Sequence, residues 1–338
     1  MTTTRTKRAA TGALTGLALG DALGFPTEFN DVPSILATCG PWREMELPKP
    51  AFVTDDTQMT LALGRGLRTA MDRGPLTGLR LARPVREEYV DWYHSPDNNR
   101  APGRTCLEAC HLLDSDRAWQ EASRTGSKGC GANMRVAPIG LAPGLTDEQR
   151  SGAAQLQSAL THGHPTALAA SDLTARAVYL LAQGAEPLGL IGRLRSYAFE
   201  NRERYLDRWL GDLWRHTHDA SPEAFISRGW DECLAALETV QDALRAPSPE
   251  TDPCERTGDG WIAEHALATA LHCFLLFPDE PVTALRRAAC TRGDSDSIAC
   301  LTGALAGAHL GPDAWLAAWV ERIEYRDELL ELGALWDA

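Results

Sequence analysis

Two carboxylates one residue apart, Asp294 and Asp296, are each followed by a hydroxyl side chain, Ser295 and Ser297. They come directly before Ile298–Gly311, a run of small and apolar residues that predicts a helix. Asp and Ser favour helix N-termini because their side-chain oxygens accept hydrogen bonds from free backbone N–H groups. Oxygen ligands at this density also suit a hard cation such as Mg²⁺, Mn²⁺ or Ca²⁺. For this segment alone, an acidic helix cap is the simpler interpretation, and a metal site is the alternative.

Acids and hydroxyls are combined in the same way at two other turns. Thr54-Asp55-Asp56-Thr57 opens a second segment with helical periodicity, and Gly20-Asp21-Ala22-Leu23-Gly24 is followed by Glu28. At a helix N-terminus both aspartates of the first motif can point forward from the helix end, where negative charge is favoured. Carboxylates that are brought together without a cation repel one another. We therefore expect the three acidic turns to converge on one metal site.

A glycine-rich segment, Gly126–Arg135, is a candidate for phosphate binding, because backbone N–H groups freed in such a segment can bind phosphate oxygens. It lacks the Gly-Lys-Ser/Thr ending of a nucleoside-triphosphate loop and follows no predicted strand, so a flexible loop is the simpler interpretation. His162 and His164 are candidates for metal or substrate binding, although a histidine in a turn is more often structural. Trp261 and Phe274 are interpreted as core residues.

The composition is that of a soluble globular protein, with 44% hydrophobic and 23% charged residues in a chain of 338. Its 33 basic and 46 acidic residues give a net charge of −13, which argues against broad, sequence-independent binding to nucleic acid or anionic membranes. The nine cysteines include no Cys-x-x-Cys pair and no zinc-ligand spacing. We interpret them as reduced residues of a cytoplasmic protein. No segment is long enough to cross a membrane.

The N-terminal segment admits two interpretations. Basic residues precede the apolar residues 9–19, a pattern that resembles a secretory signal. Glycines recur every four residues here, however, and place a smooth stripe on one helix face. These glycines are Gly12, Gly16 and Gly20, and the spacing recurs at Gly303 and Gly307. We favour a helix of the mature domain that packs closely against a second helix, preceded by a disordered tail, residues 1–8.

Helical periodicity covers most of the chain and strand-like alternation is almost absent, which predicts an all-α protein. Thr54 and Thr146 are predicted N-caps, the second in a capping box with Gln149. Two segments rich in Pro and Gly, 31–51 and 245–260, are predicted loops. Helices are expected at about 9–21, 54–67, 79–92, 107–113, 146–160, 165–183, 188–216, 222–245, 261–277, 298–311 and 314–336.

Five motifs, in this order, resemble the ADP-ribosylglycohydrolases, a group that includes the dinitrogenase reductase-activating glycohydrolase and the ADP-ribosylarginine and ADP-ribosylserine hydrolases. The motifs are the Gly20–Gly24 turn with Glu28, Thr54–Thr57, the Gly126–Arg135 loop, Thr161-His162 and Gly293–Ser297. The resemblance covers residues 9–311, nearly the whole chain. It implies a compact single-domain orthogonal helical bundle over residues 9–338, with two Mg²⁺ ions, or Mn²⁺ in some members, at the base of a cleft.

The resemblance also implies roles for individual residues. The implied metal ligands are Glu28, Thr54, Asp55, Asp56, Asp294, Asp296 and Ser297. Glu28 is alternatively a mobile gate at the metals, and we take Glu28, Asp55 and Asp56 as catalytic candidates. Around the diphosphate the resemblance implies Gly126, Ser127, Gly129 and Gly131, with Cys130 beside the phosphates. It implies that His162 approaches the ADP-ribose, and that Gly103 and Thr105 lie near the distal ribose.

Two positions depart from the pattern of the resembling family. Cys130 stands where many members have Asn, so the pocket beside the phosphates is expected to differ. Ser295 and Ser297 replace the commoner threonines, which keeps the hydroxyl group and should leave metal binding intact. Neither departure removes an implied ligand.

On this basis we predict a Mg²⁺-dependent hydrolase that releases ADP-ribose from a protein side chain, or from nucleic acid, by cleaving the bond at the anomeric ribose carbon. Asp55 or Asp56 would position or deprotonate the attacking water. A two-metal nucleotide phosphoesterase is one alternative, and it would release phosphate instead. A non-catalytic ADP-ribose-binding relative is the other, although a binder has little need of the complete acidic set. Arginine, serine, a nucleic-acid base and a small molecule all stay open as acceptors, and so does the oligomeric state.

Overall fold

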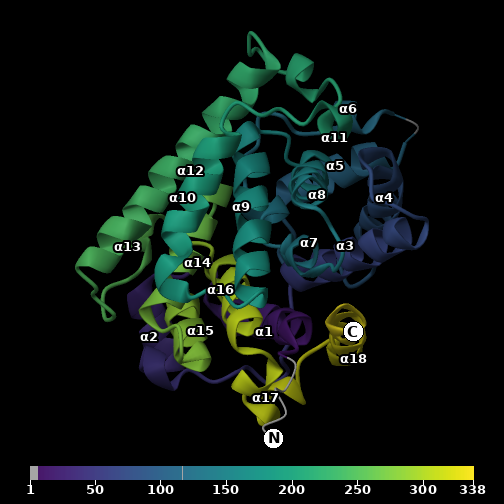
Figure 1. Ribbon diagram of the computed structural model, residues 1–338. Helices are drawn as coiled ribbons and strands as arrows, with labels where there is room; N and C mark the ends of the chain where they lie inside the picture. Colours follow the sequence, from purple (N-terminus) through teal and green to yellow (C-terminus); the bar gives the residue numbers. More distant parts are fainter. Residues whose placement is uncertain (1–6, 116) are drawn as a thin grey trace, which may run out of the picture.

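Helices account for the regular structure of the part of the chain that is described, residues 7–115 and 117–338 of a computed structural model (Figure 1). Two isolated bridges are the only β-type contacts within these ranges. The predicted all-α fold is therefore confirmed. Of the predicted disordered tail, residues 1–6 lie outside the described ranges. Among the described residues, no helix combines the length and apolar character needed to span a membrane.

The α-helices follow one another along the chain with short connections. Their bounds are α1 Ala9–Gly24, α2 Val32–Cys39, α3 Asp55–Asp72, α4 Gly78–His94, α5 Arg104–Leu113, α6 Trp119–Ala122, α7 Ala137–Leu141, α8 Asp147–Ala159, α9 Pro165–Ala182, α10 Leu190–Asn201, α11 Asp207–Leu210, α12 Pro222–Arg245, α13 Cys254–Thr257, α14 Ala263–Leu276, α15 Pro281–Ala289, α16 Ser295–Leu310, α17 Ala317–Val320 and α18 Arg326–Asp337. In Figure 1, α9, α10 and α12 run side by side, and α3, α4, α5 and α8 form a second group.

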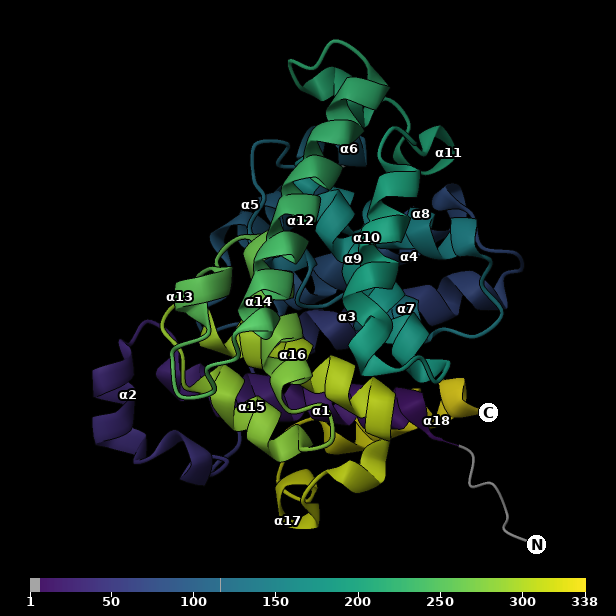
Figure 2. The same cartoon turned by 60° about the vertical axis from the view of Figure 1, so that its left-hand side comes forward.

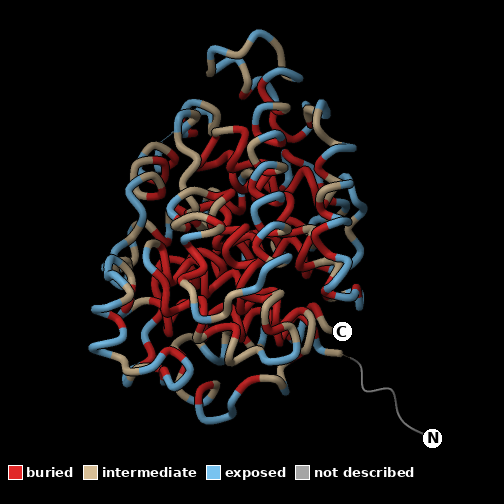
Figure 3. The backbone as a smooth tube through the Cα atoms, turned by 90° about the vertical axis from the view of Figure 1, so that its left-hand side faces the viewer, coloured by how far each residue is buried: buried red, intermediate tan, exposed pale blue. Residues whose placement is uncertain are grey.

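Helices α1 and α16 pack against each other in antiparallel orientation along their length, and their backbones touch where α1 has glycines. Figure 2 shows both helices in the lower half of the molecule. A methyl group added at Gly12 would lie 2.5 Å from the carbonyl oxygen of Gly307, and one added at Gly303 would meet the carbonyl oxygen of Gly16. Every residue of α1 is buried. The expected close packing between the two glycine stripes is confirmed, and these helices lie in the buried interior seen in Figure 3.

The C-terminal helix α18 caps the first turn of α1. The carboxylate of Asp337 accepts hydrogen bonds from the backbone N–H groups of Ala10, at 2.8 Å, and Thr11, at 3.0 Å, and from the Thr11 hydroxyl at 2.6 Å. Free N–H groups at a helix N-terminus need such an acceptor, and negative charge there is favoured by the helix dipole. The residue before α1, Arg8, supplies no side-chain cap, so this distant carboxylate takes its place.

The loop predicted at 31–51 contains a helix, α2. The Asp31 carboxylate caps it by accepting from the Ser34 N–H at 2.9 Å, Pro33 lies in its first turn, and Gly40 follows its end at a φ of 78°. Proline at the start and glycine just past the end are ordinary boundaries of a helix. The same residues were therefore misinterpreted as markers of a loop.

Three other boundaries differ from the predictions. The helix expected at 188–216 ends at Asn201 and is followed by the short α11, and the predicted loop at 245–260 contains the single-turn helix α13. The helix expected at 314–336 is interrupted before α18 by Tyr325, whose φ of 55° no α-helix contains. The Thr146–Gln149 capping box is confirmed, and so is the N-cap at Thr54.

Gly303→Ala tests the close packing of α1 against α16. Its new methyl group would meet the Gly16 carbonyl, and overpacking of this kind costs about 1–3 kcal/mol of unfolding free energy. As a matched control, Gly192→Ala lies in α10 with no atom within 4 Å of the new methyl group, and it should stabilise by about 0.5–1 kcal/mol. Denaturant unfolding measures both. Equal effects of the two substitutions would contradict the role of this close packing.

Candidate active site and metal centre

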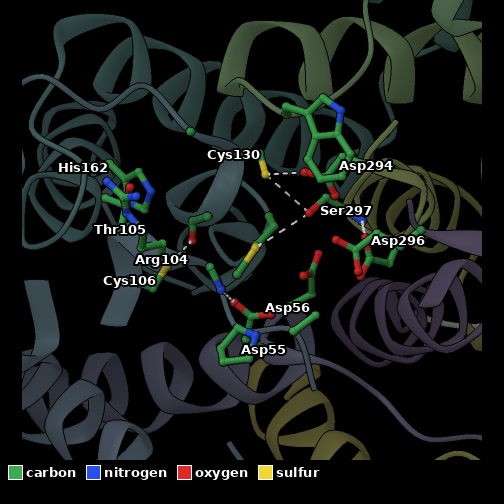
Figure 4. A pocket seen from close by; sticks show the side chains of 18 of the residues that line it. Asp55, Asp56, Arg104, Thr105, Cys106, Cys130, His162, Asp294, Asp296 and Ser297 are labelled. Atoms are coloured by element: carbon green, nitrogen blue, oxygen red, sulfur yellow. Dashed lines mark hydrogen bonds between the residues drawn. The ribbon is translucent and has the colours of Figure 1, made fainter. Parts of the chain in front are cut away.

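The acidic turns and the glycine-rich loop meet in one cleft of about 340 Å³ (Figure 4). Of the fifteen residues predicted for the site, twelve line this cleft: Glu28, Asp55, Asp56, Gly103, Thr105, Gly129, Cys130, Gly131, His162, Asp294, Asp296 and Ser297. The other three lie beside it. Thr54 is buried behind Asp56, the Ser127 hydroxyl is 2.9 Å from that of Thr105, and Gly126 precedes Ser127 in the loop.

The aspartates at the start of α3 are held by Asp21 of α1. Its buried carboxylate accepts from the Thr54 N–H at 3.0 Å and hydroxyl at 2.9 Å, and from the Thr57 N–H at 3.0 Å and hydroxyl at 2.5 Å. These bonds fix the turn that carries Asp55 and Asp56 at the cleft. Burial raises the pKa of Asp21 to about 6, although the hydrogen bonds from Thr57 and Thr54 oppose the shift. The sequence motif contained Asp21, but no positioning role was assigned to it.

The start of α16 is fixed against the end of α1. A methyl group at Gly24 would lie 2.5 Å from the Cα of Asp296, so only glycine allows this approach. The Ser295 hydroxyl donates to the Gly24 carbonyl at 3.1 Å and lies 2.9 Å from the hydroxyl of Thr27. Because Thr27 immediately precedes Glu28, these contacts bring the Glu28 turn beside the aspartates of α16.

Asp294 takes the N-cap position of α16 but makes no side-chain capping bond. Its carboxylate instead accepts from the thiol of Cys130, with Sγ 2.7 Å from Oδ2 (Figure 4). Asp294 therefore occupies the N-cap position, but its contact with Cys130 is not one that an ordinary helix cap makes. The Asp294 side chain lines the cleft and is available to a ligand that binds there.

Three carboxylates of the cleft are close enough to share one cation. Glu28, Asp294 and Asp296 each offer an oxygen, and these atoms all lie within 4.8 Å of one another. The Oδ1 atom of Asp56 is buried and has no hydrogen-bond partner. A buried carboxylate oxygen without a partner is costly, and a bound cation removes that cost. An all-oxygen donor set of carboxylates and hydroxyls fits a hard divalent ion.

Burial and mutual repulsion raise the pKa values of these acids. The pKa of Glu28 rises to about 8 through burial and through the neighbouring Asp294 and Asp55. Burial raises that of Asp55 to about 7, against a hydrogen bond of 3.1 Å from the Gly103 N–H. The pKa values of Asp56 and Asp296 are raised further in the same direction, by burial first.

The opposite wall is built around the buried cation Arg135. Its guanidinium donates to the Thr161 hydroxyl at 2.7 Å, and that hydroxyl lies 2.9 Å from Nδ1 of His162. Burial, reinforced by Arg135, lowers the pKa of His162 to about 3, so the imidazole is uncharged at neutral pH. A methyl group at Gly131 would lie 3.0 Å from the His162 ring, which explains the glycine here.

Comparison with known proteins agrees with this geometry. A sequence model of the ADP-ribosylglycohydrolases matches residues 1–338. The chain belongs to the ADP-ribosylglycohydrolase family. It is therefore a glycohydrolase, and the predicted family membership is confirmed.

Relatives and a solved structure of similar length match nearly the whole chain. The ADP-ribosylhydrolase ARH3 of Bos taurus is 27% identical over 94% of this chain and 89% of its own. The ADP-ribosyl-[dinitrogen reductase] glycohydrolase of Rhodospirillum rubrum is 26% identical over 94% and 91%. A solved structure described as an ADP-ribosylglycohydrolase-related protein complex superposes with a TM-score of 0.66 at 22% identity, covering 98% of each chain. It supports the ADP-ribosylglycohydrolase fold.

A pair of stacked aromatic rings at the cleft of this glycohydrolase escaped the sequence analysis. Phe29 and Trp261 both line the cleft, with ring centroids 5.4 Å apart and planes inclined by 20°. They are 69% and 41% exposed, so the interpretation of Trp261 as a core residue is wrong, whereas Phe274 is fully buried as expected. Trp261 precedes α14, outside its apolar face. Its position as the first residue of the helix predicted at 261–277 was the signal available.

The raised pKa values predict how the metal-free protein responds to pH. Glu28 and Asp55 bind protons more tightly in the folded state than in the unfolded chain, where carboxyl pKa values are about 4. Unfolding then releases protons, so stability falls as pH rises towards about 8. The buried histidines, whose pKa values are lowered, make stability rise with pH below about pH 6.5, so they oppose this effect there. We therefore expect the melting temperature of chelator-treated protein to fall between about pH 6.5 and 8.

Asp55→Asn provides the control for this pH dependence, because the amide cannot lose a proton and should give a shallower slope. Differential scanning fluorimetry across the same pH range measures both proteins. A melting temperature of the metal-free wild type that stays constant or rises with pH would contradict the assignment.

Proposed function

We propose that this glycohydrolase is a divalent-metal-dependent enzyme that removes ADP-ribose from an ADP-ribosylated acceptor by cleaving the bond at the anomeric ribose carbon. The observation that carries the proposal is the convergence of Glu28, Asp294 and Asp296 within 4.8 Å, beside the unpartnered Oδ1 of Asp56. Burying this many carboxylates in one cleft is unfavourable unless a cation binds among them. The names of the relatives, which describe ADP-ribose hydrolysis, point to the same reaction.

The residues proposed to hold two Mg²⁺ ions, or two Mn²⁺ ions, come from the three acidic turns. They are Glu28, Thr54, Asp55, Asp56, Asp294, Asp296 and Ser297. When bound, the ions would neutralise the carboxylates, hold the ribose hydroxyls and polarise a water molecule. Asp21 keeps the Thr54–Asp56 turn in place through its hydrogen bonds, and Gly24 lets the Asp296 backbone approach.

The two ends of the cleft differ in charge, and this difference orients the substrate. The acids occupy one end, so the terminal ribose with its scissile bond would lie there. The wall formed by Thr105, the Gly129–Gly131 backbone and His162, with Arg135 behind it, would receive the diphosphate and the rest of the nucleotide, because its groups do not repel phosphate oxygens as carboxylates do. We propose Asp55 or Asp56 as the group that positions or deprotonates the attacking water.

The acceptor would leave the cleft past the stacked rings of Phe29 and Trp261. Phe29 follows Glu28 directly, so the pair stands at the acidic end, where the bond to the acceptor is cleaved. Exposed aromatic rings offer apolar contact and attract cations. We propose that this pair contacts the acceptor side chain.

Asp56→Asn should lower the release of ADP-ribose by about a hundredfold or more, because it removes a charged ligand and misplaces the reacting groups. Incubation with Mg²⁺ and ADP-ribosylated arginine, serine and DNA substrates, with the product identified by mass, measures this. Release of inorganic phosphate in place of intact ADP-ribose would replace the proposal with a phosphoesterase. Asp72→Asn, at the exposed far end of α3, serves as the control and should keep wild-type rates.

Metal binding has a readout that does not depend on turnover. At a hundredfold excess over Kd, a cation that binds only the folded state adds about 2.7 kcal/mol of stability. Mg²⁺ or Mn²⁺ should therefore raise the melting temperature of chelator-treated wild type and have little effect on Asp296→Ala. Identical shifts in the two proteins would place the metal elsewhere.

Trp261→Ala should raise KM for an ADP-ribosylated protein by about tenfold, the loss of one aromatic contact of about 1.4 kcal/mol. KM for a small ADP-ribosyl compound without a side chain in the acceptor position should change little. Steady-state kinetics on both substrates separates the two effects. A parallel change in both KM values would assign Trp261 to the nucleotide instead of the acceptor.

A further inference from the structure

An ion pair outside the cleft joins two segments that lead into it. The guanidinium of Arg100 binds the carboxylate of Glu324 through both of its terminal nitrogens, with Nη2 2.9 Å from Oε1. The two side chains are 15% and 25% exposed, so salt and water screen this pair less than they screen an ion pair on the open surface. Neither residue lines the cleft. Any effect of the pair on the reaction must therefore pass through the backbone that it holds.

The pair encloses the peptide groups of Val53, the residue before Thr54. Nη1 of Arg100 donates to the Val53 carbonyl at 2.6 Å, and the Glu324 carboxylate accepts from the Val53 N–H at 3.0 Å. Val53 is fully buried, where a backbone group without a partner is costly. The N–H of Glu324 also donates to the carbonyl of Ala51 at 3.3 Å. The chain that enters α3 is therefore held by this one pair.

The loop that carries Arg100 continues directly into the cleft. Residues 101–105 all line it, and the Gly103 N–H donates to Oδ2 of Asp55 at 3.1 Å. The loop is held a second time by the residue after Glu324, because the Tyr325 hydroxyl donates to Oδ2 of Asp97 at 3.3 Å. The short segment before α18 thus fixes both the loop and the start of α3, and these two meet at Asp55.

The chemistry of the guanidinium suits this junction. Its donors lie in one rigid plane, so Arg100 can bind a carboxylate and a carbonyl at once, which a lysine ammonium cannot do with the same geometry. A reacting group that is misplaced by about 1 Å can lose roughly a hundredfold in rate. We propose that Arg100 and Glu324 are positioning residues, whose ion pair sets where the Asp55 carboxylate stands in the cleft. This inference rests on the proposed function for the role of Asp55.

The first test needs neither metal nor substrate and compares two variants of the full-length protein. Glu324→Gln keeps the shape of the side chain, but its amide nitrogen cannot accept from Arg100 or from the Val53 N–H. Glu328→Gln is the matched control, because Glu328 pairs with Arg65 between α18 and α3 without touching either segment. Amide hydrogen exchange of residues 51–58 and 100–106, followed by peptide mass, should accelerate about tenfold or more in Glu324→Gln alone.

The second test separates positioning from stability. Well below the melting temperature, Glu324→Gln should lower kcat for ADP-ribose release by about tenfold or more and leave KM within about threefold of the wild type. Arg100→Lys should lose kcat in the same way although it keeps the charge. Glu328→Gln should keep the wild-type kcat.

Two results would overturn the positioning role. One is a lowered melting temperature with wild-type kcat in Glu324→Gln and Arg100→Lys, which would make the pair a stabilising contact only. The other is the same exchange rate of residues 51–58 and 100–106 in the wild type and in Glu324→Gln. Failure of the wild type to release ADP-ribose from any substrate would instead refute the proposed function, and the exchange rates would still decide whether the pair holds the two segments.

Discussion

The backbone contact between α1 and α16 is the constraint from which the site follows. Without side chains at Gly12, Gly16 and Gly303, the two helices approach until carbonyl oxygens fill the space of the missing methyl groups. The last glycine of the stripe, Gly24, places the end of α1 against the Cα of Asp296. Glu28 and Asp21 then stand beside the aspartates of α16 and α3. The chemistry of the cleft therefore depends on a backbone contact made by glycines, which themselves carry no reactive group.

That arrangement trades stability for function. The acids gathered at the cleft are buried, and each would be more stable in water than beside its neighbours. The surrounding helices supply the compensation, through a core in which α1 is buried over its whole length and through hydrogen bonds that hold Asp21. Rigid packing around an active site can hold together groups that repel one another and would otherwise move apart.

The acidic turns and the glycine stripe could be read from neighbouring residues alone, whereas the residues expected around the substrate were implied by the family resemblance. Thr54 followed by two aspartates predicts an acidic helix start, and glycines at four-residue spacing predict a smooth helix face. Both predictions depend only on residues close together in the sequence. Prediction was wrong where one residue type serves two purposes. Pro33 and Gly40 delimit a helix as readily as they make a loop. Trp261 is apolar, and only the fold determines that it faces a cleft instead of the core. The hydrogen bonds of Asp21 join residues 33 and 36 positions apart, a distance at which spacing carries no information.

The cap that Asp337 places on α1 sets the order in which this protein can be assembled. Its hydrogen bond to the Ala10 N–H joins residues 327 positions apart. At ribosomal rates of ~5–20 residues per second, α1 waits roughly 15 to 65 s for that partner. For most of this interval the glycine face of α1 lacks its partner α16, although α3 and α7, which also contact α1, have already been made. Contacts so distant in sequence also slow folding. The cleft takes Asp294 and Asp296 from the start of α16, so it can form only after the residues between α1 and α16 have been made.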